Sequence, residues 1–284
     1  GYMAGVTGGS LVLRGTSGGS SRVDNVYVGS KIGGDNFGAG SLDVSAGSVN
    51  ARVTRFTVGY YAANASNSHS GTFTMSSGTV DATTLALGMV EVSSGSVGTP
   101  TVASVVNQSG GLVKASTVVF GSNGATLGTN SPTFNGTYNL TGGTLAAASI
   151  ATGGGTFNTA SNRRIAWTNG TITNYDSATD LLIDGTTGTG GGLAIDMTGS
   201  GAKVFAPDAG RTITVGSFAV ISNTGALTVN GPGMVVLNAA NTYSGGSVIS
   251  AGTLKAGNVS AFGSAGVTVA SGATLDLNSL AVAN

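Results

Sequence analysis

Residues 225–277 read GALTVNGPGMVVLNAANTYSGGSVISAGTLKAGNVSAFGSAGVTVASGATLDL. Short runs in this stretch alternate apolar with small polar residues, and glycine interrupts the chain every few positions. The pattern is typical of short strands joined by tight turns and repeated many times. Because one such unit buries little apolar surface alone, neighbouring units must stack on each other. The stretch therefore predicts an elongated β-solenoid rather than a globule built around one pocket.

A second and longer repeat occupies the first half of the chain. Its four copies are LDVSAGSVNA (42–51), FTMSSGTVDA (73–82), VNQSGGLVKA (106–115) and YNLTGGTLAA (138–147). The aligned glycines are Gly47, Gly78, Gly110 and Gly143, so the repeat length is about 32 residues. Each copy runs on into an apolar segment that ends in glycine, at 56–59, 85–88, 118–121 and 149–153. One unit is therefore predicted to be strand, glycine turn, strand, strand and turn.

Apolar residues within a unit occupy every second position, as in Leu42 with Val44 and Phe73 with Met75. Period two places them on one face of a strand and leaves Ser, Thr, Asp and Asn on the other. We expect an all-β fold that forms one continuous β-solenoid over residues 1–284. Its parts are the longer repeats in 1–155, a less regular solenoid with longer loops in 156–224, and the short repeat in 225–284.

The composition excludes several classes of protein. Of 284 residues 50 are glycine, 8% are charged, and 11 basic side chains balance 11 acidic ones. Without a basic patch to neutralise phosphates, nucleic-acid binding is not expected. The longest apolar runs, such as 218–221, are too short to insert across a membrane. The absence of cysteine excludes disulfides, thiolate metal sites and cysteine nucleophiles, so ladders and stacked side chains must hold the rod together.

The C-terminal stretch carries a family resemblance. The blocks NTYSGG (241–246), AGTL (251–254), AFGSAGVTV (261–269) and SGATLDL (271–277) resemble the autotransporter-associated β-strand repeat, which we match over residues 225–277. That family is similar to passenger segments of very large secreted proteins of Gram-negative bacteria. The resemblance implies a right-handed parallel β-helix at the cell exterior and brings no catalytic residues with it.

Several residues were considered as catalytic or ligand-binding candidates. His69 is the only histidine, and without an elbow-type serine motif we interpret it as a solvated loop residue. Three aspartates, Asp176, Asp180 and Asp184, lie four residues apart, and a second series runs Asp184, Asp196, Asp208 in steps of twelve. Asp184 and Asp208 would support glycoside hydrolysis if they stacked one coil apart. Our preferred interpretation is that these are solvated turn aspartates.

Two glycine-rich motifs and four large or charged side chains are also interpreted as structural. GGDNFGAG (33–40) resembles a calcium-binding repeat but lacks the required GGxGxD order, and the glycine run 185–192 lacks the Lys-Ser/Thr ending of a phosphate loop. Arg163 and Arg164 are expected on a solvated face or paired with aspartates. Trp167 and Tyr175 are expected to be core or end-capping residues.

The sequence thus predicts a non-enzymatic structural module of a large secreted bacterial surface protein, located outside the cell. We assign no catalytic, cofactor-binding or metal-ligating residue and expect no cofactor. The expected partner is another copy of the chain, end to end or side by side, forming an extracellular fibre. Two alternatives remain open: an adhesin that binds a host, a neighbouring cell or a glycan, and a polysaccharide lyase or hydrolase.

Overall fold

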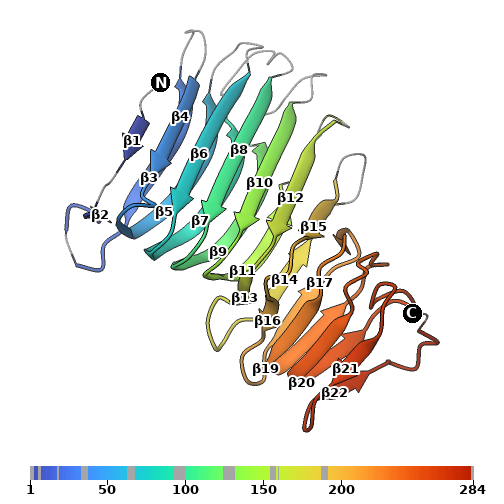
Figure 1. The fold of residues 1–284 in the computed structure, drawn as a ribbon. Coiled ribbons are helices and arrows are strands. Elements are labelled where there is room, and N and C mark those ends of the chain that lie inside the picture. Colours follow the sequence, from blue (N-terminus) through green and yellow to red (C-terminus); the bar gives the residue numbers. More distant parts are fainter. Residues whose placement is uncertain are drawn as a thin grey trace.

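The fold is known from a computed structural model that describes residues 3–5, 8–17, 19–32, 38–62, 68–91, 100–123, 132–153, 158, 160–186 and 191–282. Strands follow one another along an elongated axis, with the N-terminus and the C-terminus at opposite ends (Figure 1). All described strand pairs are parallel, so the predicted all-β parallel solenoid is confirmed. Its right-handed sense stays a prediction.

The first sheet, sheet A, contains one strand from each of eight successive coils and runs along one side of the rod. Its strands, in spatial order, are β1 (Met3–Gly5), β4 (Gly38–Asp43), β6 (His69–Met75), β8 (Thr101–Gln108), β10 (Thr133–Leu140), β12 (Asn162–Trp167), β15 (Leu193–Met197) and β18 (Ala219–Ser222). Within them buried and half-buried residues alternate strictly, as in β6, β8 and β10. The period-two pattern of the sequence is therefore the division between core and surface.

The second sheet, sheet B, bends around the other sides of the core and extends beyond sheet A toward the C-terminus. Its strands are β2 (Ser10–Leu13), β3 (Val23–Ile32), β5 (Ser48–Ala62), β7 (Gly78–Val90), β9 (Leu112–Asn123), β11 (Thr144–Thr152), β13 (Gly170–Asn174), β14 (Leu181–Asp184), β16 (Lys203–Ala206), β17 (Thr212–Val215), β19 (Leu227–Leu237), β20 (Ser247–Ala256), β21 (Val267–Val269) and β22 (Thr274–Asp276). Long strands such as β5 supply two sides of a coil, whereas β13 and β14 divide the same path into two strands.

One corner of the solenoid is a stack of left-handed glycines. Gly78, Gly111, Gly143 and Gly170 have φ values of 90°, 71°, 76° and 108°. A Cβ on Gly111 would lie 2.6 Å from the carbonyl oxygen of Gly78, so each coil approaches the next too closely for a side chain. The alignment that placed Gly110 in this series was wrong by one position, because that copy holds two adjacent glycines. Gly47 was also wrong, since Val49 lies opposite Gly78.

The glycines that end the second apolar segments form a further stack, as the sequence indicated. Gly59, Gly88 and Gly121 all have positive φ values, and the paired residues on either side of them bring them into register. There the strand bends toward the inner face of sheet A, where a Cβ on Gly59 would clash with Ser104 Oγ. The solenoid is therefore narrow at this corner.

The length of one coil changes along the rod. In sheet A, Leu42 pairs with Phe73, Phe73 with Val106, and Val106 with Tyr138. A coil there takes 31 to 33 residues, and hydrogen bonds made by side chains between neighbouring coils join residues with the same separation along the chain. In sheet B, Leu227 pairs with Ser247 and Ser247 with Val267, so a C-terminal coil takes 20 residues. One apolar core nevertheless continues from the first coils to Phe262.

Candidate functional surface

The outer side of the three central strands of sheet A carries short, uncharged side chains, and we call this surface the A face. We define it by the outward residues of its three central strands: Ser70, Thr72 and Thr74 of β6, Ala103, Val105 and Asn107 of β8, and Asn135, Thr137 and Asn139 of β10. All nine are half-buried by their neighbours. They lie in three columns, because the strands pair in register from one coil to the next.

Amide and hydroxyl groups hydrogen-bond along one column of the A face. Asn139 Nδ2 donates to Asn107 Oδ1 at 2.7 Å, and Asn107 Nδ2 donates to Thr74 Oγ1 at 3.1 Å. Asp43 lies at one end of this column and Asp196 continues it at the other. Charged side chains thus border the A face without entering it.

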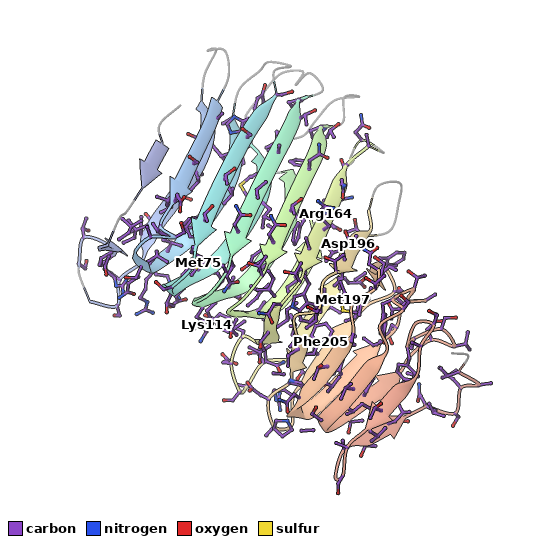
Figure 2. All side chains as sticks on the ribbon, in the orientation of Figure 1. Met75, Lys114, Arg164, Asp196, Met197 and Phe205 are labelled. Atoms are coloured by element: carbon purple, nitrogen blue, oxygen red, sulfur yellow. The ribbon has the colours of Figure 1, made fainter. Side chains whose placement is uncertain are left out.

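Ion pairs elsewhere join one coil to another. Arg164 Nη1 lies 3.7 Å from Asp196 Oδ2 on the neighbouring strand of sheet A (Figure 2). Three more pairs connect successive coils of sheet B: Arg55 with Glu91, Arg211 with Asp180, and Lys255 with Asp276. The charged groups of these pairs therefore serve the stacking of coils.

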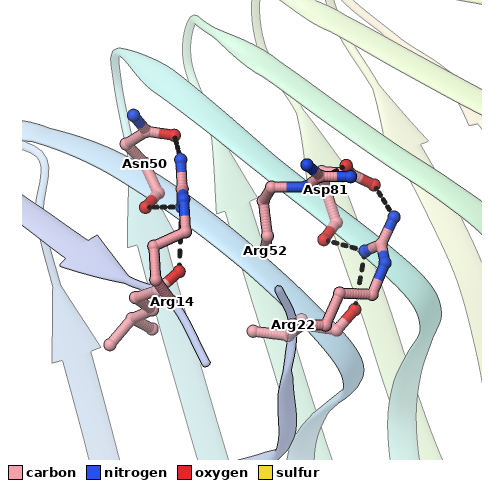
Figure 3. A network of polar contacts seen from close by, with 7 residues as sticks. Arg14, Arg22, Asn50, Arg52 and Asp81 are labelled. Atoms are coloured by element: carbon pink, nitrogen blue, oxygen red, sulfur yellow. Dashed lines mark hydrogen bonds and ion pairs between the residues drawn. The ribbon is translucent and has the colours of Figure 1, made fainter. Parts of the chain in front are cut away.

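The densest polar network fastens the first coil to the second and third (Figure 3). Arg22 Nη2 lies 2.7 Å from Asp81 Oδ1, and Arg22 Nη1 donates to the carbonyl oxygens of Val53 and Asp81 at 2.9 and 2.8 Å. Arg52 Nε approaches the other oxygen of Asp81 at 3.2 Å. Arg14 donates to the backbone oxygen and the side-chain oxygen of Asn50 at 2.6 and 2.5 Å.

Asp184 and Asp208 do not stack, so the pair of carboxylates that glycoside hydrolysis would need is not formed by these two residues. The register of β14 on β17 places Asp184 beside Gly216, and Asp184 Oδ1 accepts hydrogen bonds from the amides of Gly185 and Phe218 at 2.8 and 2.9 Å. The equal spacing of the aspartates along the sequence does not bring them together, because a coil in this region takes 32 residues. Asp184 and Asp208 are fewer residues apart than one coil.

The other aspartates have local structural partners. Hydrogen bonds from the side chain of Thr179 and from the amide of Ala178 lower the pKa of the Asp176 carboxyl group within its turn. Asp180 Oδ1 accepts from the amide of Thr212 at 2.9 Å, and Asp196 accepts from the side chains of Ser222 and Asn223. These contacts explain the conformation of the carboxylates without a substrate.

His69 is not the solvated loop residue that we expected. It is the first residue of β6, is 3% exposed, and its Nε2 lies 2.7 Å from the carbonyl oxygen of Gly29. Alternation with Gly71 and Phe73 turns it inward. Beside it is a shallow hollow of about 270 Å³ lined by Ser68, Ser70 and Thr101 among others, and no carboxylate lines it among the described residues.

Arg163 and Arg164 point in opposite directions because they are neighbours on β12. Arg164 forms the ion pair that was expected, whereas Arg163 is 2% exposed and lies among the inward side chains, so a solvated position for it was wrong. Burial lowers the pKa of the Arg163 guanidinium. The same alternation buries Lys203, whose Nζ donates to the carbonyl oxygen of Gly199 at 2.5 Å.

Trp167 is a core residue, as expected: it is fully buried, donates from Nε1 to the carbonyl oxygen of Gly170 at 3.1 Å, and packs edge-on against Phe205 at 5.0 Å between ring centres. Tyr175 is half-buried under the ammonium of Lys114, which lies 4.3 Å from its ring centre. Residues 33–37 of the GGDNFGAG motif and 187–190 of the glycine run lie outside the described residues.

Polar groups inside the core were missed from the sequence. Tyr138 Oη donates to Gln108 Oε1 at 2.6 Å, and Gln108 Nε2 donates to the carbonyl oxygens of Gly111 and Thr144. Asn241 bridges coils near the C-terminus, since its Oδ1 accepts from the amide of Ile221 and its Nδ2 donates to the carbonyl oxygen of Ala261. The sequence did contain a sign of their burial, because each of these polar residues occupies a position where the alternation calls for an apolar residue.

Two features are absent from the described part of the chain. No group of three or more His, Asp or Glu side chains there is arranged to hold a metal ion. No described helix is long and apolar enough to cross a membrane.

Comparison with known proteins gives two similarities. Residues 227–256, which contain β19, β20 and the loop between them, match the passenger-associated transport repeat. A stretch of 157 residues is 35% identical to the adhesin BmaC autotransporter of Brucella suis biovar 1 (strain 1330). The match covers 53% of this chain and only 4% of that protein, so the chain corresponds to a small part of it. No solved structure matches.

Proposed function

We propose that this chain is a non-enzymatic structural segment of an autotransporter passenger, exposed on the surface of a Gram-negative cell or secreted from it. The observation that carries the proposal is the match of 227–256 to the passenger-associated transport repeat on two coils whose core is continuous with the rest. A similarity of 35% to part of an autotransporter adhesin supports the same assignment.

The mechanical basis of this function is the parallel ladder. Each coil hydrogen-bonds to its neighbours at a spacing of about 4.8 Å, so extension or bending must break several backbone bonds together. Ion pairs between coils and buried polar bridges such as Asn241 hold neighbouring layers in register. A rod built in this way resists proteases and can hold other segments away from the cell.

The experiment is surface display. The chain is fused to an outer-membrane translocator in a Gram-negative host, and its exposure is measured by antibody labelling of intact cells and by limited proteolysis. We expect a labelled, protease-resistant fragment that contains all the strands. The matched control is Gly111→Val, which places a side chain against the neighbouring coil. If the wild-type segment stays inside the cell or is as protease-sensitive as the control, the proposal fails.

A second candidate function is adhesion. The observation that favours it is the similarity to a protein named as an adhesin. In that case the purified chain should bind cells or a glycan array saturably, and substitutions on the outer faces should abolish binding without changing the fold. Absence of saturable binding on cells and glycans would leave the structural role alone.

The partner that we propose for the structural role is another copy of the chain. A net charge of zero means that copies do not repel one another at long range. The A face supports association side by side, because none of its nine outward residues is charged.

A further inference from the structure

We propose that a hollow beside Phe218, on the outer side of sheet A, binds a neutral pyranose unit of a polysaccharide. The inference rests on the adhesive role given above as the second candidate function, and it names a site and a class of ligand for that role. The hollow lies where β12, β15 and β18 begin, and its volume is about 370 Å³. Pockets for small ligands range from about 300 Å³ upward, so a single sugar ring fits.

Phe218 is an aromatic side chain that the fold leaves in water. It is 41% exposed, whereas Phe205 and Phe262 in the core are at most 1% exposed. A pyranose ring has an apolar face of C–H groups. When this face packs against an aromatic ring, both apolar surfaces are removed from water. Phe218 therefore provides the wall of the hollow on which a sugar ring can stack.

The backbone that carries the Phe218 ring is held on both sides. Its amide donates to Asp184 Oδ1 at 2.9 Å, and its carbonyl oxygen accepts from the amide of Leu193 at 2.9 Å. A Cβ on Gly185 would lie 2.7 Å from the same carbonyl oxygen, so this close approach leaves no room for a side chain there. Because this backbone is already ordered, the ligand does not have to order it, which lowers the entropic cost of binding. Asp184 is in this sense a positioning residue.

The floor and the rim of the hollow suit the two kinds of surface on a sugar. Ala194 and Val220 are paired neighbours on β15 and β18, and their small outward side chains form an apolar floor. Asn162, at the exposed start of β12, lies on the rim with Ser161. A carboxamide both donates and accepts hydrogen bonds, so Asn162 can bind two adjacent hydroxyl groups of a pyranose.

Among the described residues, no charged group is presented to a ligand in this hollow. Arg163 forms part of the wall, but its three guanidinium nitrogens are buried. Arg164 and Asp196, on the same strands β12 and β15, pair with each other at 3.7 Å. A charged sugar would therefore lose hydration without gaining a counter-charge. A neutral sugar is the ligand class that the hollow favours.

The first test is affinity electrophoresis of the chain in native gels that contain a neutral glucan, galactan or mannan. We expect at least one of these polymers to retard the wild type, and Phe218→Ala to bind it at least about tenfold more weakly. Phe218→Trp keeps an aromatic face and should bind about as well as the wild type. The proposal is overturned if none of the three polymers retards the wild type, or if Phe218→Ala is retarded equally.

Leu182→Ala is the matched control for Phe218→Ala. Leu182 is an apolar side chain of similar exposure, 48%, and it lies on β14 of sheet B, away from the hollow. Its substitution should leave the retardation unchanged, whereas Asn162→Ala should weaken binding by about threefold or more. If Leu182→Ala weakens binding as much as Phe218→Ala, general contact with exposed apolar groups explains the retardation and the proposal is wrong.

Two further readouts separate the ligand class and the site from the functions proposed above. A polyuronate and a sulfated polysaccharide are run in parallel gels, and retardation by these polymers alone overturns the assignment to a neutral sugar. Circular dichroism and protease resistance are measured on the same samples, so an intact rod that binds no polysaccharide refutes this site and leaves the structural role standing. Binding of a neutral polymer that Phe218→Ala does not change would place adhesion on another surface, and this site would be wrong.

Discussion

The coils of β4 to β11 and the coils of β19 and β20 build the same kind of rod in different ways. In the first region a coil takes 31 to 33 residues, sheet A is fully formed, and glycine stacks define the corners. In the second region a coil of 20 residues replaces the sheet A strand with an irregular loop that a buried asparagine holds in place. The long coils thus close their third side with a strand of sheet A, whereas the short coils close it with a loop that a side-chain bridge fastens to its neighbours.

The largest expected effect breaks the glycine corner of the long coils. Gly111→Ala should lower the free energy of unfolding by about 4 kcal/mol, because positive φ strains alanine and its Cβ would lie 2.6 Å from the carbonyl oxygen of Gly78. Chemical denaturation monitored by the fluorescence of the single tryptophan, Trp167, provides the measurement.

Gly210→Ala is the matched control for that substitution. Its φ of 69° is almost the same, but no atom lies within 4 Å of the position of its Cβ. It should cost only about 1 kcal/mol, the strain of the backbone alone. If the two variants lose equal stability, close approach between coils is not what requires glycine at this corner.

The next effect breaks the asparagine bridge of the short coils. Asn241→Ala leaves the amide of Ile221 and the carbonyl oxygen of Ala261 without their partner, which should cost about 3 kcal/mol. Thr242→Ala, at an exposed position beside it, should change stability little. Hydrogen exchange would measure the effect strand by strand.

Because repeats couple mainly to their neighbours, Asn241→Ala should raise exchange in β18 to β20 and leave β6 to β10 protected. A uniform rise along the whole chain would show that long and short coils unfold as one unit, and the distinction between the two regions would then be structural but not energetic.

A large part of this architecture could be predicted from the sequence, because period two and the repeat spacing reflect backbone geometry. The same rule could have placed His69, Arg163 and Lys203 inside, since each alternates in phase with buried neighbours such as Phe73, Ile165 and Phe205. For His69 and Arg163 the residue type misled us, because charged and polar residues are expected on the surface.

Contacts between coils could not be predicted in the same way. Whether Asp184 lies beside Gly216 or near Asp208 depends on the number of residues in each coil, and turns absorb insertions without any change in strand pattern. The A face is the exception. Its polar columns could be predicted once the register was known. That they form one uncharged surface becomes evident only when the three strands are placed side by side.

A smaller effect concerns how the stability of the short-coil region depends on pH. Burial raises the pKa of Tyr243 in the short-coil region from 10.0 to about 12. The unfolded chain ionises this phenol near pH 10, so its stabilising contribution is intact below that pH and is lost as the pH rises toward 12. At pH 11 the loss should be about 1.4 kcal/mol.

Tyr243→Phe should remove this part of the pH dependence. The measurement is the free energy of unfolding of both proteins at neutral pH and at pH 11. If the difference between the wild type and Tyr243→Phe is the same at the two pH values, burial of the phenol does not oppose its ionisation as proposed.

The smallest expected effect concerns the fastening of the first coil. Arg22 and Asp81 have side chains that are 24% and 19% exposed, so their ion pair is partly screened by water. Arg22→Ala should therefore cost only about 0.5–1 kcal/mol, and less at high salt. The loss should appear as faster hydrogen exchange in β3 and β5, whose pairing Arg22 supports through the carbonyl oxygen of Val53.

The Arg22→Lys variant tests whether the charge of Arg22 or the shape of its guanidinium protects β3 and β5 from exchange. Lysine keeps the attraction to Asp81 but has one nitrogen, whereas the guanidinium reaches the carboxylate with Nη2 and the two carbonyl oxygens with Nη1. Exchange in Arg22→Lys close to that of Arg22→Ala would mean that the forked geometry holds the coil. Exchange close to that of the wild type would mean that the attraction between opposite charges is enough to fasten the first coil to Asp81.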